Sequence, residues 1–149
     1  MTETITTRSP EETAGVARRI SRYLNIGDVL SLEGNLGAGK SVFARAVGAA
    51  KGVEGPMPSP TYAIALDYPG TIPVLHLDLY RLAGEDEFEM LDLEPLIATS
   101  LTIVEWGDRA PQLLNRARVR VRIEHGSGDD NRCLLIEWQE GIHGTSARD

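Results

Sequence analysis

A glycine-rich segment between a short apolar run and a helix-forming segment is the feature that most constrains this chain. Residues 29–32 (VLSL) predict a buried strand, and residues 41–50 (SVFARAVGAA) predict a helix with one apolar face. The segment that joins them fits the pattern G-x-x-x-x-G-K-[ST] and reads Gly34-Asn35-Leu36-Gly37-Ala38-Gly39-Lys40-Ser41. A strand, this loop and a helix in that order are the context that a phosphate-binding P-loop requires.

The residue types in this loop each have a physical role in binding a phosphate group and its metal ion. Glycines allow successive backbone N–H groups to turn toward phosphate oxygens, and the helix that follows directs its positive end at the anion. Lys40 supplies a mobile positive charge for the β- and γ-phosphates, and the Ser41 hydroxyl is suited to Mg²⁺. We expect ATP or ADP with Mg²⁺ as the ligand, because no N-K-x-D segment for guanine is present. The predicted nucleotide-binding residues are Asn35, Leu36, Gly37, Ala38, Gly39, Lys40, Ser41 and Val42.

Two acidic residues at strand ends are candidates for the metal that a P-loop site needs. Residues 73–80 alternate so that Asp78 lies on the polar face of the strand, opposite its leucines, and Glu105 ends the run 101–105. Such acids hold Mg²⁺ directly or through water. Either acid fits this role alone, or one anchors the metal while the other orients the attacking water.

The other candidate residues carry a weaker functional signal. Thr61, after Ser-Pro, is either a sensor of the γ-phosphate on a mobile loop or a hydroxyl that caps the entrance of a strand. Trp106, beside Glu105, is in general more often a core or interface residue than a catalytic one. The three histidines, His76, His125 and His143, lack the spacing of metal ligands.

The remaining pattern predicts an α/β fold with a mixed parallel and antiparallel sheet flanked by helices. Ser9 followed by Pro10 predicts a helix that starts there and runs to about Leu24. Runs 62–68 and 73–80 are joined closely enough for an antiparallel hairpin. The acidic segment 85–97 predicts a helix with Phe88, Leu91 and Met90 facing inward and a break at Pro95. Further strands are predicted at 101–105, 118–124 and 133–138.

Length and composition favour one globular domain over residues 1–149, with a flexible tail at 141–149. The net charge of −7 opposes direct binding of RNA by this chain alone. A lone cysteine, the lack of a secretory signal and the lack of an apolar run of about 20 residues favour a cytoplasmic location without membrane attachment.

Four segments together resemble the TsaE family, also known as YjeE. They occur in the expected order between Ser9 and Trp106 and comprise the P-loop segment 34–41, Ser59-Pro60-Thr61-Tyr62, His76-Leu77-Asp78-Leu79-Tyr80-Arg81-Leu82 and Val104-Glu105-Trp106. The resemblance implies a P-loop fold and a weak ATPase that binds the TsaD–TsaB pair. That pair acts in the pathway that places threonylcarbamoyladenosine next to the anticodon of certain tRNAs, so contact with tRNA is expected only through partners.

The resemblance also implies roles for individual residues. Ser41 and Glu105 bracket Mg²⁺, Asp78 assists hydrolysis or the water shell, Thr61 lies in a switch-like loop, and Trp106 is functionally sensitive. The chain departs from the common family pattern in three places: Ser41 replaces threonine, Asn35 replaces aspartate and Gly107 replaces proline. Beyond Leu114 the resemblance thins to a strand-turn-strand pattern, where it implies a nucleotide contact for Arg132.

Two other functions compete with a partner-controlled ATPase. A small-molecule kinase would share the P-loop, but so short a chain leaves no arginine-rich lid insert or evident acceptor pocket. A nucleotide-dependent assembly factor would regulate its partner through the binding state alone, with little turnover.

Overall fold

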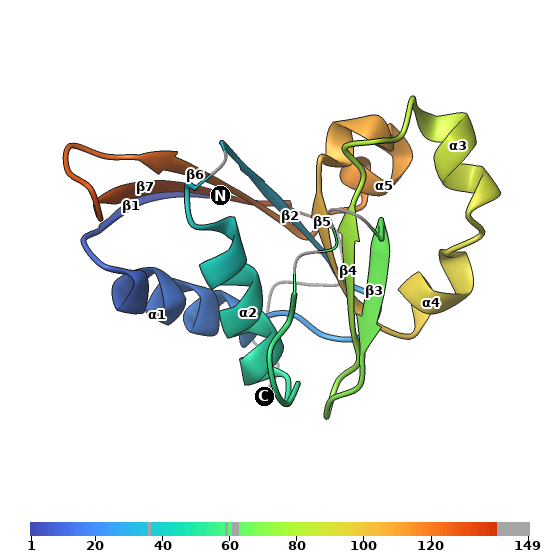
Figure 1. Cartoon of the computed structure of the whole chain (residues 1–149), viewed down its shortest axis with the longest axis horizontal. Coiled ribbons are helices and arrows are strands. Elements are labelled where there is room, and N and C mark those ends of the chain that lie inside the picture. The colour runs from blue at the N-terminus through green and yellow to red at the C-terminus, as the bar shows by residue number, and fades with distance from the viewer. Residues whose placement is uncertain (36, 59, 61–62, 140–149) are drawn as a thin grey trace.

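Figure 1 shows the computed structural model, which describes residues 1–35, 37–58, 60 and 63–139. The strands are β1 (Thr2–Thr7), β2 (Val29–Gly34), β3 (Ala65–Tyr68), β4 (Val74–Asp78), β5 (Leu101–Glu105), β6 (Val119–His125) and β7 (Arg132–Trp138). The helices are α1 (Pro10–Ser21), α2 (Lys40–Ala50), α3 (Glu85–Met90), α4 (Glu94–Ala98) and α5 (Pro111–Asn115), with a 3-10 turn η2 (Gly107–Arg109). None of the helices in this part of the chain is long and apolar enough to cross a membrane.

The strands of the described residues form one mixed sheet in the order β1-β7-β6-β2-β5-β4-β3. Its centre is parallel, because β2 pairs with β5 and β6, and β5 pairs with β4, all in the same direction. β3 is antiparallel to β4, and β7 is antiparallel to both β6 and β1. The predicted hairpin and the mixed α/β architecture are therefore confirmed.

Helices cover both faces of the sheet, and each face has its own core. α1 and α2 pack Ile20, Phe43 and Val47 against residues of the central strands, including Leu30 and Ile103. On the other face α3, α4 and α5 contribute the side chains Phe88, Ile97 and Leu113, which pack with Leu75, Leu77 and Val104. The leucines of β4 thus lie on the α3–α5 face. By the two-residue period of a strand, His76 and Asp78 lie on the α1–α2 face.

The start of α1 follows the prediction from its cap. The N–H of Glu12 donates to the Ser9 hydroxyl at 3.1 Å, and Pro10 occupies the first turn. The helix ends at Ser21, earlier than the predicted Leu24, and Leu24 donates its N–H in a short-range bond to Ser21. Leu24 is nevertheless fully buried, as its place in the apolar pattern predicts.

Several boundaries differ from the prediction. β1, which pairs with β7, was not predicted, and β3 begins at Ala65, whereas the predicted start, Tyr62, lies outside the described residues. The predicted helix 85–97 is two short helices, with Pro95 in the first turn of the second. Met90 and Leu91 are 84% and 37% exposed, so their predicted inward orientation is wrong, whereas Phe88 is buried as predicted. The predicted tail 141–149 also lies outside the described residues.

Gly34 joins the end of β2 to the glycine-rich loop at a point where no side chain fits. Its φ is +153°, and an added Cβ would lie 2.5 Å from the carbonyl oxygen of Ile123 on β6. We expect Gly34→Ala to lower the free energy of unfolding by on the order of 1–3 kcal/mol, because both the backbone and the strand pairing must shift. Urea denaturation measures the loss. Gly84→Ala is the control, since that glycine has extended backbone with open space around it and should change little.

Candidate functional site

The loop between β2 and α2 has the backbone of an anion-binding turn. Gly37 and Gly39 have φ values of +79° and +111°, which residues with side chains rarely adopt. Ala38 donates its N–H to the carbonyl of Asn35 at 3.0 Å, which closes a tight turn. Such a loop can turn backbone N–H groups toward a bound anion.

The first turn of α2 adds further N–H donors at the same place. Gly39 is the N-cap and has no side chain to satisfy them, and Phe43 makes the first i to i+4 bond, to the carbonyl of Gly39. The N–H groups of the first residues of any helix lack acceptors within the helix. In α2 these residues are Lys40, Ser41 and Val42, so the positive end of the helix is open toward the loop.

Lys40, Glu105 and His76 form a charged cluster beside the loop. The Lys40 ammonium nitrogen lies 3.4 Å from Oε1 of Glu105, and Nε2 of His76 lies 2.8 Å from Oε2 of the same carboxylate. The side chains of Lys40 and Glu105 are only 16% and 10% exposed. Each oxygen of Glu105 therefore has its own nitrogen partner.

The cluster determines the ionisation of Glu105. Burial by itself raises the pKa of this carboxyl group, but the hydrogen bond and charge of His76, together with those of Lys40, outweigh burial. The net result is a pKa below its ordinary value. Glu105 is therefore a carboxylate near neutral pH, which is the form that can bind a metal ion or orient water.

Asp78, the second predicted acid, lies directly beside Glu105. The two residues are paired in register at the carboxyl ends of the parallel strands β4 and β5. One oxygen of Asp78 accepts the N–H of Tyr80 at 3.0 Å, and both acids are buried. The structure thus brings together Lys40, Asp78 and Glu105 at one edge of the sheet, as the strand pattern predicts.

The oxygen donors near the loop match the preference of Mg²⁺ for carboxylate and hydroxyl ligands. Ser41, which is exposed, follows Lys40 in the first turn of α2. Among the described residues, no group of three or more His, Cys, Asp or Glu side chains could hold a metal by itself. Leu36 and Thr61, also predicted here, lie outside the described residues.

Trp106 follows Glu105 in an unusual conformation. Its φ is +58°, in the left-handed region that a bulky residue rarely enters. The indole is 40% exposed and lies 4.8 Å from the ring of Tyr80, with the guanidinium carbon of Arg109 at 5.6 Å. Trp106, after β5, and Tyr80, after β4, therefore form an exposed aromatic pair next to the charged cluster, with Arg109 beside it.

Two residues of the site have roles that the sequence did not indicate. His76 lacked metal-ligand spacing, yet it holds Glu105, and the only sequence signal was its place on the same strand face as Asp78. Arg132 donates hydrogen bonds to the carbonyls of Gly37 and Ala38 in the loop. No sequence signal indicated this bracing contact, because the partners lie more than 90 residues apart.

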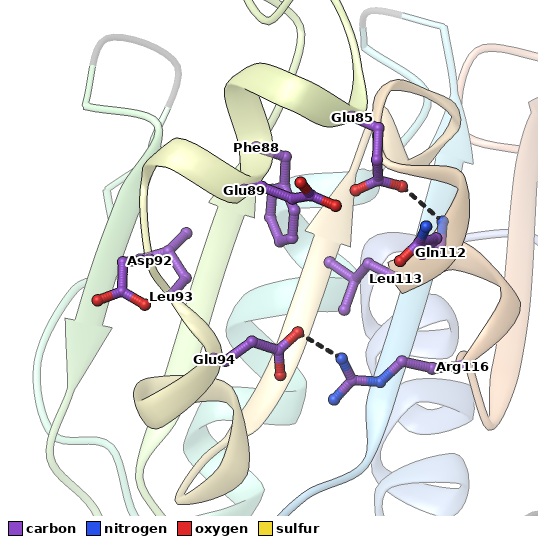
Figure 2. Close-up of a pocket in the computed structure, with 9 residues that line it drawn as sticks. All are labelled: Glu85, Phe88, Glu89, Asp92, Leu93, Glu94, Gln112, Leu113 and Arg116. Carbon is purple, nitrogen blue, oxygen red and sulfur yellow. Dashed lines mark hydrogen bonds and ion pairs between the residues drawn. The ribbon is translucent and has the colours of Figure 1, made fainter.

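A separate cavity of about 240 Å³ lies on the α3–α5 face, away from the loop (Figure 2). Phe88 and Leu113 contribute apolar surface, while Glu89 and Asp92 lie at its rim. Arg116 in the lining is paired with Glu94 at 2.7 Å. Four of the five charged residues in the lining are carboxylates, which disfavours a phosphate ligand, so this cavity is a poorer candidate for a nucleotide than the loop.

The fold and the site define an α/β protein with a mixed sheet and a glycine-rich loop between a strand and a helix. More particularly, the chain belongs to the TsaE family, because the family model described as "Threonylcarbamoyl adenosine biosynthesis protein TsaE" matches residues 7–134.

Individual relatives agree with this assignment. The chain is similar to the tRNA threonylcarbamoyladenosine biosynthesis protein TsaE of Streptomyces coelicolor, with 41% identity over 76% of this chain and 80% of that protein. It is 37% identical to the Bacillus subtilis protein of the same name over 87% of this chain and 82% of the relative. The crystal structure of Bacillus subtilis YdiB superposes with a TM-score of 0.66 at 28% identity, over 91% of this chain and 84% of that one.

The lowered pKa of Glu105 predicts how acid affects stability. A carboxyl group with a lowered pKa in the folded state stabilises that state above its ordinary pKa, and the contribution is lost as the pH falls through the folded-state value. We expect the stability advantage of wild type over Glu105→Gln to shrink as the pH falls below about 4.5. Urea denaturation at pH 7 and at pH 4 and below measures this.

Gly84→Ala, which changes no titratable group, is the control and should keep a constant difference from wild type. An advantage of wild type over Glu105→Gln that stays constant or grows as the solution is acidified would contradict the assignment.

Proposed function

We propose that this chain binds Mg·ATP at the loop between β2 and α2, hydrolyses it slowly and thereby serves threonylcarbamoyladenosine formation on tRNA. The observation that carries the proposal is the meeting of Lys40 and Glu105, 3.4 Å apart, beside a loop of left-handed glycines in a member of the TsaE family. A cation for phosphates and a carboxylate for a metal are the two charges that ATP hydrolysis needs at one point.

The nucleotide is held by residues 35–42, with Lys40 at the β- and γ-phosphates. The ammonium of Lys40 then leaves Glu105 for the phosphate oxygens, which frees Oε1 of Glu105. His76 still holds the other oxygen, so the carboxylate keeps its orientation during this exchange. Lys40 is able to make the exchange because it is a flexible side chain at the start of α2.

Mg²⁺, when bound, neutralises charge on the phosphates. Ser41 and Glu105 are the proposed residues that hold it, and Asp78, in register beside Glu105, orients water or completes the shell. Thr61 stays a prediction as the sensor of the γ-phosphate. These assignments use only oxygen ligands, which Mg²⁺ prefers.

The proposed partner is the TsaD–TsaB complex, with tRNA reached only through it. The net charge of −7 supports this arrangement, because an acidic chain repels the phosphate backbone of RNA. Trp106 and Tyr80 are exposed beside the proposed ATP site, where a partner could sense or complete it. A cytoplasmic location fits this role.

One observation favours a second candidate, a nucleotide-dependent assembly factor with little turnover. In the structure both oxygens of Glu105 already have partners, Lys40 and His76. A carboxylate so occupied makes hydrolysis by the isolated chain slow, and the bound nucleotide could then regulate the partner by its presence alone.

Hydrolysis measured with and without the partner separates these functions. We expect slow ATP hydrolysis by the purified chain, stimulation by the TsaD–TsaB complex of the same organism, and a loss of about a hundredfold or more in Lys40→Ala. The loss follows from removing the charge that faces the γ-phosphate. Partner-stimulated hydrolysis that persists in Lys40→Ala would contradict the proposal that ATP is hydrolysed at this loop. Nucleotide-dependent association without turnover would favour the assembly factor.

The proposed role of Glu105 predicts a split between binding and turnover. Glu105→Ala should reduce Mg²⁺-dependent hydrolysis far more than the affinity for ATP, because the loop, α2 and Lys40 remain. Isothermal titration and a steady-state assay measure the two quantities. Glu3→Ala, which removes a half-buried glutamate of β1 that pairs with Arg19, is a matched control and should change neither. Hydrolysis by Glu105→Ala at the wild-type rate would refute the assignment.

A further inference from the structure

Arg132 connects the β6–β7 turn to the glycine-rich loop. It is the first residue of β7, and its Nε and Nη2 donate to the carbonyls of Ala38 at 2.9 Å and Gly37 at 3.2 Å. Its Nη1 donates to the carbonyls of Asp129 at 2.7 Å and Asn131 at 2.9 Å. One guanidinium group therefore ties two consecutive peptide units of the loop to the neighbouring turn.

These bonds use most of the hydrogen-bonding capacity of Arg132. A guanidinium group has five N–H donors, and four of the Arg132 donors are directed at backbone carbonyls. Only one N–H donor of Arg132 therefore remains for a contact with a nucleotide, which is the role that the resemblance implied for this residue. Arg132 therefore bonds mainly to backbone carbonyls behind the loop.

The bonds also determine the direction of N–H groups in the loop. In a trans peptide the C=O and the following N–H point in opposite directions, so fixing the Ala38 carbonyl fixes the N–H of Gly39 away from Arg132. The same holds for the Gly37 carbonyl and the N–H of Ala38, which is donated to Asn35. Without such bonds the flanking glycines would allow these peptide units many orientations.

We propose that Arg132 is a positioning residue that pre-organises the phosphate-binding loop and places a positive charge behind it. The inference rests on the proposed function, because it assumes that the loop binds the phosphates of a nucleotide. The ligand chemistry concerned is the polyphosphate chain alone, since Arg132 acts through the carbonyls of Gly37 and Ala38. A loop ordered before binding loses less conformational freedom when the ligand arrives.

The test measures binding of Mg·ATP and of inorganic tripolyphosphate with Mg²⁺ by isothermal titration at fixed ionic strength. We expect Arg132→Ala to weaken both ligands by the same factor, about tenfold. Arg132→Lys should recover only a small part of the loss, because a compact ammonium cannot reach carbonyls on both sides. Amide hydrogen exchange of Gly37 to Gly39 in the ligand-free protein should be faster in Arg132→Ala, a change that loss of a ligand contact alone would not cause.

Arg122→Ala is the matched control, since this arginine lies on the adjacent strand β6 and pairs with Glu33 at the surface. It should leave both affinities unchanged. If Arg132→Ala does not fold, Arg132→Gln, which also removes the charge and the fork of donors, takes its place in the comparison.

Three outcomes would overturn the inference alone: unchanged affinity in Arg132→Ala, a loss confined to ATP, which would indicate a contact with base or ribose, and full recovery by Arg132→Lys. If folded wild-type protein binds neither ligand, the proposed function fails and the inference fails with it. Binding by wild type that is unaffected in Arg132→Ala leaves the proposed function standing.

Discussion

The parallel pairing of β2 with β5, and of β5 with β4, is the constraint on which the site depends. In this register Leu32 lies opposite Glu105, and Glu105 lies opposite Asp78, so the carboxyl ends of three strands meet at one edge. The glycine-rich loop leaves β2 two residues further on, at Gly34. A shift of one residue in either pairing would turn the acids toward the opposite face, because the side chains of a strand alternate. The apolar residues of both faces, which would all be displaced by such a shift, therefore fix the charged cluster in place.

The cluster itself is a compromise between burial and charge. Removing a carboxylate from water is unfavourable unless partners replace the lost hydration, and Glu105 has one partner on each oxygen. The two partners differ in mobility. His76 lies within the buried strand β4, whereas Lys40 is a long side chain at the start of a helix. The arrangement therefore has one fixed contact and one that can be exchanged, and a phosphate is a natural competitor for the second.

The sequence predicted the parts of the fold and site that depend on local pattern. The loop motif identified Lys40, and strand alternation placed Asp78 on the face opposite the leucines, because both signals lie within a few residues. The contacts of His76 with Glu105 and of Arg132 with Ala38 depend on how distant segments pair, which no local period encodes. Met90 was misplaced for a related reason. The acidic segment is two short helices rather than one, so a single helical period does not describe which side chains face the core.

Charge is distributed unevenly over this acidic chain, and that distribution determines where an anion can bind. Residues 85–94 contain six acidic residues and no basic one, and they lie on the α3–α5 side of the sheet. Around the glycine-rich loop, the start of α2, Lys40 and Arg132 supply positive charge within a short distance of one another. Because exposed charges are screened beyond about 8–10 Å, an anion at the loop responds mainly to the groups nearest to it, which also include the carboxylates of Glu105 and Asp78. We expect this arrangement to favour a nucleotide at one edge of the sheet over a long polyanion such as RNA, which must follow the wider acidic surface.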